Sequence, residues 1–302
     1  LENEPAVEIY TTTRRRSNLE NVEHLLDKIK LVECNMLDSH NTEDIIKTIK
    51  PNKVFHLSAQ SHVATSWTSP CDTFSTNILG QVNLFEAIRK YNADARVLIC
   101  GSSEEYGTVY SNELPIKEDN PLRPLSPYAV SKVAQDVMGY QYWKSYNLQI
   151  VRTRAFNHSG PRRPDAFVDA GFAKQIVEAE LGLRKPVIYH GNLEAIRDFT
   201  HVKDMARAYW LALEKCDAGD VYNICYGTGT RIQDMLNDLA SMAHVDIKLE
   251  LDTNRLRPSD VPVLVGDCSK FKELTCWKPV LTQQDIQHDT LNYWRDKLKR
   301  KM

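Results

Sequence analysis

The chain has 302 residues, of which 42% are apolar and 26% charged, and these values exclude a disordered or fibrous protein. Lys and Arg number 38 against 40 for Asp and Glu, so the formal net charge is −2. This balance offers no basic face, and we therefore expect no nucleic-acid partner and no membrane partner.

The seven cysteines and nine histidines do not indicate a metal site. The cysteine count is odd, no pair has CxxC spacing, and the histidines show no HExxH motif. We therefore expect no metal, no disulfide framework and reduced thiols, which favours a cytoplasmic protein.

The first half of the chain alternates strand-like and helix-like segments. Expected strands are 7–12, 30–33, 54–58, 96–101 and 150–153, and expected helices are 22–26, 41–50, 70–91 and 127–146. This alternation predicts an α/β fold with a doubly wound parallel sheet of the Rossmann type.

After Arg154 the alternation becomes irregular. Helix-like segments at 170–183, 202–215 and 232–243 are separated by strand-like segments at 187–189, 221–225 and 247–251. We expect residues 1–154 to form a dinucleotide-binding domain. Residues 155–302 should form mainly a smaller α/β substrate-binding portion, interleaved with the end of the sheet. The ligand in such a fold lies at the carboxyl ends of the strands.

The strongest chemical signal is the pair Tyr128 and Lys132 in the segment SPYAVSK, because residues four apart share one face of a helix. An ammonium beside a phenol is expected to lower the tyrosine pKa from ~10 towards neutrality, so that the pair can move a proton near pH 7. Alone, this spacing also fits a solvated surface pair. Ser102, in GSSEEYG, follows the strand 96–101 and could hydrogen-bond the same substrate oxygen.

Four segments in fixed order, GSSEEYG, SPYAVSK, FNHSGPRR and GNLEAIRDFTHVKD, resemble the extended short-chain dehydrogenase/reductase superfamily. Within it the chain is similar to the branch that acts on GDP-mannose, which comprises GDP-mannose 4,6-dehydratases and GDP-4-keto-6-deoxy-mannose reductases. The resemblance extends from Val7 to about Pro279.

The resemblance assigns Ser102, Tyr128 and Lys132 to the catalytic set, and Glu104 to the acid/base position of the dehydratases. It implies conversion of GDP-mannose to GDP-4-keto-6-deoxy-mannose by oxidation at C4, loss of the C5 proton and of water from C6, and hydride return to C6. Two alternatives stay open. One is an NADPH-dependent reductase of the keto-sugar, and the other is a non-catalytic nucleotide-sugar binding protein.

The cofactor we expect is NADP. Arg14, Arg15, Arg16 and Ser17 follow the strand 7–12, where a dinucleotide-binding sheet meets the adenosine ribose and arginine accommodates the 2′-phosphate. The alternative is a basic surface turn. The resemblance adds further cofactor positions at Asn35, Leu57, Ala59, Gln60 and Ser61, besides Tyr128 and Lys132. It assigns the nucleotide-sugar to Asn157, Val168, Lys174, Arg197 and Arg257.

The sequence contains no GxGxxG or GxxGxxG motif. In the family, a first strand and a glycine-rich turn that approaches the pyrophosphate should precede Val7, so we expect a segment ahead of Leu1 to supply them. The resemblance further implies a homodimer or homotetramer, with 70–91 and 127–146 as candidate interface helices.

Overall fold

The computed structural model of the chain describes residues 6–256, 261–300 and 302. Its centre is a parallel sheet of four strands in the order β3-β4-β5-β9. These strands are β3 (Lys53–His56), β4 (Arg96–Ser102), β5 (Gln149–Ala155) and β9 (Val221–Ile224). Because all four run in the same direction, their carboxyl ends meet at one edge of the sheet, where a ligand is expected.

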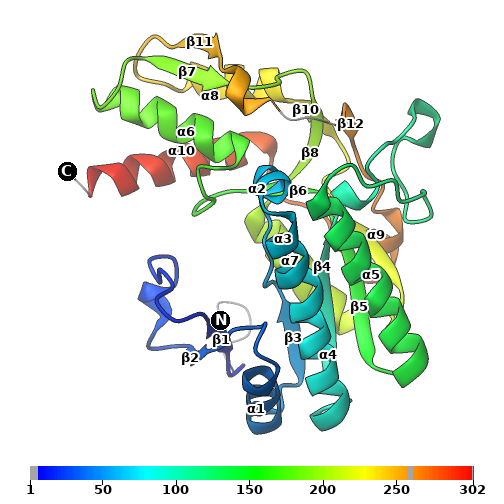
Figure 1. Ribbon diagram of the computed structural model, residues 1–302. Coiled ribbons are helices and arrows are strands. Elements are labelled where there is room, and N and C mark those ends of the chain that lie inside the picture. The colour runs from blue at the N-terminus through cyan, green and yellow to red at the C-terminus, as the bar shows by residue number, and fades with distance from the viewer. Residues whose placement is uncertain (1–5, 257–260, 301) are drawn as a thin grey trace.

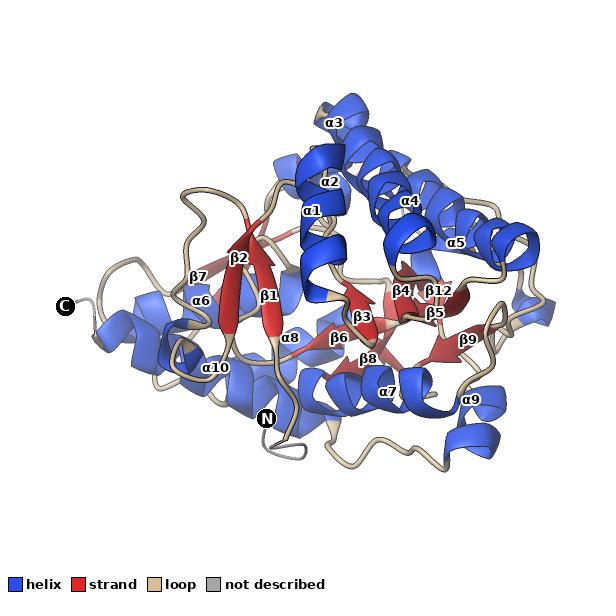
Figure 2. Ribbon diagram, turned by 90° about the horizontal axis from the view of Figure 1, so that it is seen from below, coloured by secondary structure: helices blue, strands red, loops and turns tan. Residues whose placement is uncertain are grey.

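Helices cover both faces of this sheet (Figures 1 and 2). α4 (Gly80–Tyr91) and α5 (Pro127–Tyr146) lie over one face, and α7 (Val202–Lys215) and α9 (Ser269–Thr275) lie over the other. Side chains along β4 alternate accordingly: Val97 and Ile99 belong to the core beneath α4 and α5, while Leu98 belongs to the core beneath α7. The predicted α/β fold with a doubly wound parallel sheet is confirmed.

Two further strands extend the order beyond β3. β1 (Tyr10–Thr13) and β2 (Lys30–Glu33) form a parallel pair, and both views show β1 between β2 and β3 (Figures 1 and 2). Within the described residues, β1 pairs only with β2, and β3 only with β4. In a doubly wound sheet with the strand order 3-2-1-4-5-6, the first strand lies between the second and the fourth, which correspond here to β1 and β3. The strand expected ahead of Val7 stays a prediction.

The second half of the chain forms a smaller α/β portion. Strand β8 (Ile196–His201) pairs with β6 (Asn157–Ser159), β10 (Gly229–Arg231) and β12 (Val263–Leu264). A separate pair consists of β7 (Val187–His190) and β11 (Lys248–Leu251). The expected interleaving is present, because β9, α7 and α9 return to the central sheet. The boundary at residues 154 and 155 stays a prediction.

Three helices surround the core of this smaller portion. They are α6 (Val168–Glu180), α8 (Ile232–Ser241) and α10 (Gln283–Lys299), and they bury Phe172, Met235 and Trp294 among other apolar side chains. Figure 1 shows α6 and α10 running alongside each other at the end of the molecule that is remote from α5. This portion thus has its own core, next to the carboxyl ends of the central strands.

The region 70–91 is helical throughout, as the sequence predicted, but its middle turn is a π-helix. It contains α3 (Pro70–Phe74), a π-helical turn at Ser75–Leu79, and α4. The buried Asn77 lies in this turn, where its side-chain amide donates to the carbonyl of Gln60 at 3.1 Å and to the hydroxyl of Ser131 at 2.8 Å. The wider turn therefore ties the loop after β3 to α5. A short helix, α2 (Val63–Thr68), precedes it, and α1 (Ser39–Ile49) packs against α4.

Candidate active site

The end of β4 places Ser102 at the edge where the parallel strands terminate. Ser102 is also the N-cap of a 3-10 turn at Ser103–Glu105, and its Oγ accepts the backbone N–H of Glu104 at 3.2 Å. Its own N–H donates to the Glu105 carboxylate at 2.7 Å. This reciprocal capping fixes the backbone and the hydroxyl of Ser102.

α5 brings the phenol and the amine of the predicted pair to this serine. Ser126 caps the helix by accepting the N–H of Ala129, and Pro127 occupies the first turn. Tyr128 and Lys132 are both buried on the sheet-facing side, and the Ser102 side chain is near enough to the Tyr128 phenol to influence its pKa. The structure thus brings Ser102, Tyr128 and Lys132 together. Their catalytic roles stay a prediction.

The electrostatics of Tyr128 differ from the expectation. Burial raises the pKa of the phenol above its ordinary value, and the nearby Ser102 side chain lowers it only in part. The Lys132 ammonium donates to the carbonyl oxygen of Cys100 at 2.8 Å and lies 5.9 Å from the centre of the Tyr128 ring. The expected lowering of the tyrosine pKa towards neutrality is therefore wrong, because desolvation has the largest effect on the phenol and the charge of Glu104 adds to it. Burial also lowers the pKa of Lys132.

Two carboxylates follow Ser102 in different environments. Glu104 is half-buried, and its charge is near enough to Tyr128 to raise the pKa of the phenol. Glu105 is fully buried, and desolvation together with the charge of Asp136 raises its pKa to about 8. The sequence analysis considered Glu104 as an acid/base group but attached no role to Glu105, because the partners of Glu105 are distant in the sequence.

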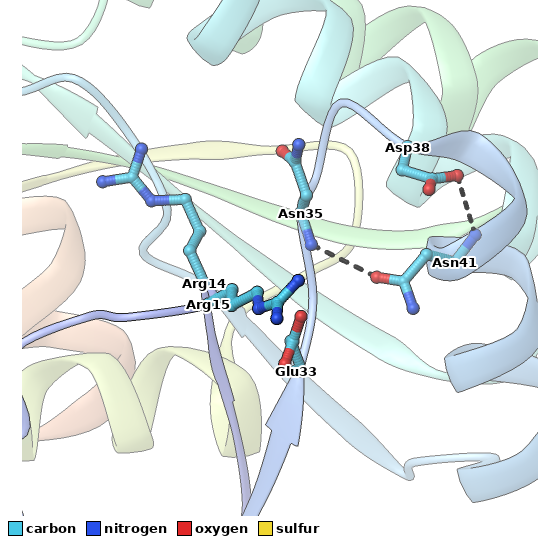
Figure 3. A pocket seen from close by; sticks show the side chains of 6 residues that line it. All are labelled: Arg14, Arg15, Glu33, Asn35, Asp38 and Asn41. Atoms are coloured by element: carbon cyan, nitrogen blue, oxygen red, sulfur yellow. Dashed lines mark hydrogen bonds between the residues drawn. The ribbon is translucent and has the colours of Figure 1, made fainter.

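The basic turn after β1 lines an open cavity of about 560 Å³ (Figure 3). The exposed Arg14 and Arg15 line this cavity together with Asn35, and Figure 3 shows the Arg15 side chain extending toward Glu33. The predicted cofactor residues Arg14, Arg15 and Asn35 are thus brought together. The sequence analysis missed Glu33, Asp38 and Asn41, which also line the cavity.

The other residues of the basic turn are Arg16 and Ser17, both exposed. Ser17 donates its N–H to the carbonyl of Arg14 at 3.0 Å, and Arg16 has a positive φ of 62°. The turn is therefore tight and presents several guanidinium groups to solvent at the end of β1. Such a cluster of planar donors suits a phosphate monoester.

The loop after β3 contains four residues predicted to line the cofactor. Leu57 and Ser61 are exposed, and Ala59 is half-buried. The Gln60 side chain turns inward, where its amide donates to the Thr73 hydroxyl at 3.0 Å and its carbonyl accepts the N–H of His62 at 2.6 Å. The structure therefore gives the Gln60 side chain a role in shaping the loop, which the sequence did not indicate.

The predicted substrate residues are spread over the smaller portion. Asn157 begins β6 and pairs in register with Phe199 of β8, two residues after the buried Arg197. Val168 begins α6 and is exposed, while Lys174 on the same helix forms an ion pair with Asp165 at 2.6 Å. Arg257 lies outside the described residues. Asn157 and Arg197 thus lie on adjacent strands, whereas Lys174 is engaged by carboxylates of its own portion.

The part of the chain that the structure describes has neither a membrane-spanning helix nor a cluster of metal ligands. None of its helices is long and apolar enough to cross a membrane. It also contains no group of three or more His, Cys, Asp or Glu side chains that could hold a metal ion.

Comparisons with known proteins agree with this fold. The family model described as GDP-mannose 4,6 dehydratase matches residues 3–290. The chain is 32% identical over 249 residues to a GDP-6-deoxy-D-mannose reductase of Pseudomonas aeruginosa, covering 82% of each chain. It is 30% identical over 319 residues to a GDP-mannose 4,6-dehydratase of Vibrio cholerae, covering 92% of this chain and 85% of the relative. A solved structure of RMD from Pseudomonas aeruginosa complexed with NADPH has a TM-score of 0.85 at 28% identity, covering 96% of this chain and 100% of that one.

The fold and the Ser–Tyr–Lys arrangement define an enzyme of the extended short-chain dehydrogenase/reductase type. Within that class, the chain belongs to the GDP-mannose 4,6 dehydratase family. The predicted superfamily, branch and enzyme class are therefore confirmed.

Proposed function

We propose that the chain is a GDP-mannose 4,6-dehydratase, which converts GDP-mannose into GDP-4-keto-6-deoxy-mannose. The observation that carries this proposal is the position of Glu104, a half-buried carboxylate two residues after Ser102 and near enough to Tyr128 to raise the pKa of the phenol. Oxidation at C4 of the hexose acidifies the proton on the neighbouring carbon, C5. A carboxylate next to the groups that serve the C4 hydroxyl is therefore well situated to take the C5 proton.

The proposed cofactor is NADP, which when bound accepts a hydride from C4 and returns it to C6. Arg14 and Arg15 would hold the 2′-phosphate, because both guanidinium groups line the cavity at the end of β1. Asn35 lines the same cavity, and its backbone N–H donates to the Asn41 side chain at 3.2 Å. This hydrogen bond fixes the cavity wall. The similarity to RMD, whose structure contains NADPH, supports this proposal.

Each catalytic side chain has a separate task in this proposal. Tyr128 and Ser102 are close neighbours, so the phenol can exchange a proton with the C4 hydroxyl while the serine hydroxyl hydrogen-bonds the same oxygen. Lys132 is the buried cation that offsets the negative charge when the phenol releases its proton. Glu104 takes the C5 proton and assists the departure of the C6 hydroxyl as water.

One observation favours a second candidate, reduction of the 4-keto-6-deoxy sugar by NADPH. The relative from Pseudomonas aeruginosa that is 32% identical is a GDP-6-deoxy-D-mannose reductase. Reduction would use Ser102, Tyr128 and Lys132 but no elimination base. Stoichiometric consumption of NADPH with the keto-sugar, and no conversion of GDP-mannose, would select this alternative.

The substitution Glu104→Gln tests the dehydratase proposal. The amide keeps the size of the side chain but cannot accept the C5 proton. Oxidation at C4 should persist, while water loss should slow by about 10²- to 10⁴-fold. Reduced cofactor should therefore accumulate, as followed by nicotinamide absorbance, and the 6-deoxy product should fall, as followed by NMR.

Glu43→Gln is the matched control, because Glu43 is also a half-buried glutamate but lies on α1 and pairs with Lys90 at 3.1 Å. We expect the control to retain wild-type dehydration. Unchanged dehydration by Glu104→Gln would refute the role of this carboxylate.

We further propose a homo-oligomer, a dimer or a tetramer, assembled through α5. Val130, Val137 and Tyr140 are exposed apolar side chains on this helix, and their spacing places them on one stripe. We also propose a reducing, cytoplasmic location, because the cysteine count is odd and no pair of cysteines has CxxC spacing.

A further inference from the structure

Glu105 is a fully buried carboxylate directly behind the catalytic serine. Its side chain is 0% exposed, and Oε1 accepts the backbone N–H of Ser102 at 2.7 Å. The other oxygen, Oε2, lies 3.2 Å from Nε of Arg154. A buried acid is costly unless it is paired and hydrogen-bonded, so this arrangement is a specific one.

The space for this carboxylate exists because residue 101 is glycine. A Cβ at Gly101 would lie 2.5 Å from Glu105 Oε1 and 2.4 Å from the carbonyl oxygen of Thr153. Any side chain there would displace either the carboxylate or the backbone of β5. Gly101 and Glu105 therefore form one packing unit beneath Ser102.

A buried ion network connects this unit to the helix that carries the other catalytic residues. Arg154 of β5 forms hydrogen bonds to the Asp136 carboxylate at 2.6 and 2.9 Å, and Arg152 reaches the same carboxylate at 2.7 Å. Asp136 lies one helical turn after Lys132 on α5. The network thus runs from the 3-10 turn that follows Ser102, through β5, to α5.

The charged and titratable groups around Glu105 come from every element packed against it. α5 contributes Asp136, Lys132 and Tyr128, while β5 contributes Arg154. The Glu104 carboxylate and the Tyr106 phenol lie on the same turn, and Glu118 lies near Tyr106. Burial and the charge of Asp136 raise the pKa of Glu105, whereas Arg154 opposes that rise.

We propose that Glu105 is a positioning residue, which holds the N–H of Ser102 and so fixes the Ser102 hydroxyl against Tyr128 for proton transfer. This inference rests on the proposed function only in the choice of substrate, because dehydration and keto-sugar reduction both need the Ser102–Tyr128 pair. Glu105 itself contacts neither the sugar nor the cofactor in this proposal. It acts through the serine.

Two substitutions separate positioning from mere stability. Glu105→Leu removes the acceptor and leaves the Ser102 N–H buried without a partner, so kcat should fall about ten- to a hundredfold with little change in KM. Glu105→Gln keeps the shape and one acceptor oxygen, and should restore most of this activity. Activities are normalised to the folded fraction measured by circular dichroism.

Glu118→Gln is the matched control. Glu118 is a half-buried glutamate whose carboxylate also accepts a backbone N–H, that of Asn223 at 2.8 Å. Its carboxylate does not contact Ser102. We expect its kcat to equal that of the wild type. If Glu105→Leu retains the kcat of this control, the positioning role is overturned.

A readout besides activity keeps the inference distinct from the proposed function. With ¹⁵N-serine labelling, the Ser102 amide resonance of the wild type should shift with pH, with a midpoint near the Glu105 pKa of about 8. In Glu105→Gln this shift should vanish, since the amide does not titrate. An identical titration in both proteins would contradict the inference. Failure of the wild type to convert GDP-mannose would instead count only against the dehydratase assignment.

Discussion

The proposed preference for NADP depends on two residues at the end of β1. Arg14 and Arg15 are exposed and line the same cavity (Figure 3). Replacing both with alanine removes the cations proposed to hold the 2′-phosphate. NADP binding should weaken about ten- to a hundredfold, while NAD binding should change little. Calorimetric titration with each nucleotide measures both dissociation constants.

Lys28→Ala is the control for this pair, because Lys28 is an exposed cation of the same portion that does not line the cavity. It should leave both dissociation constants unchanged. Equal weakening of NADP and NAD binding by the double substitution would argue against a phosphate contact.

At the residue scale, spacing along the chain predicted which groups meet but not their electrostatics. The four-residue spacing of Tyr128 and Lys132 on a helix, and the place of Ser102 at the end of a strand, were sufficient to predict that these three residues meet. The raised pKa of Tyr128 could not be predicted, because it depends on burial by residues that are distant in sequence. Glu105 was missed for the same reason, since Arg154 and Asp136 are supplied by β5 and α5.

Close packing of α5 on the sheet positions the catalytic helix. A Cβ at Gly139 would lie 2.3 Å from Cδ1 of Ile99 on β4 and 3.2 Å from the Arg152 side chain. Gly139→Val should therefore push the helix away from β4 and lower the free energy of unfolding by about 1–3 kcal/mol. Urea unfolding followed by circular dichroism measures this change.

Ser145→Ala is the companion variant on the same helix, because Ser145 is exposed and lies outside the stripe of Val130, Val137 and Tyr140. It should alter the free energy of unfolding by less than about 0.5 kcal/mol. If Gly139→Val is as stable as this variant, close approach of α5 to β4 is not what positions the helix.

At the element scale, long segments were predictable and short ones were not. The bounds expected for 127–146 and 202–215 match α5 and α7. The two- and three-residue strands β6, β10 and β12 carry too few residues for a periodic signal, and they exist because β8 pairs with them. The π-helical turn within 70–91 depends on the buried hydrogen bonds of Asn77, which local propensity does not encode.

Assembly of the molecule is testable through α5. Introducing lysine at Val137 and Tyr140 would bury two charges in the proposed interface, so the oligomer should dissociate to monomers of unchanged helical content. Light scattering coupled to size exclusion gives the mass. Val280→Lys, at a residue that is 59% exposed on another part of the surface, should not alter the mass. Retention of the wild-type mass by the α5 variant would place the interface elsewhere.

Acid stability of the whole molecule should depend on His56. Burial, with a contribution from Lys132, lowers the pKa of His56 from 6.5 to about 3. The unfolded chain therefore binds a proton at this residue between these two pH values, and the folded chain does not. This contribution to stability is complete above pH 6.5 and is lost as the pH falls towards 3.

Relative to wild type, His56→Gln should lose less stability below pH 6.5, by at most ~1.4 kcal/mol per pH unit. Urea unfolding at a series of pH values measures the difference. His40→Gln, at an exposed histidine, should follow the wild type. Parallel curves for wild type and His56→Gln would show that His56 is not kept neutral by burial.

The central claim is internal transfer of a hydride from C4 to C6 of the hexose, and GDP-mannose deuterated at C4 tests it most directly. Incubation with the full chain and catalytic NADP, followed by deuterium NMR, should show the label in the methyl group at C6 of a 4-keto product. Recovery of unchanged sugar, or a 6-deoxy product without deuterium at C6, would contradict the account.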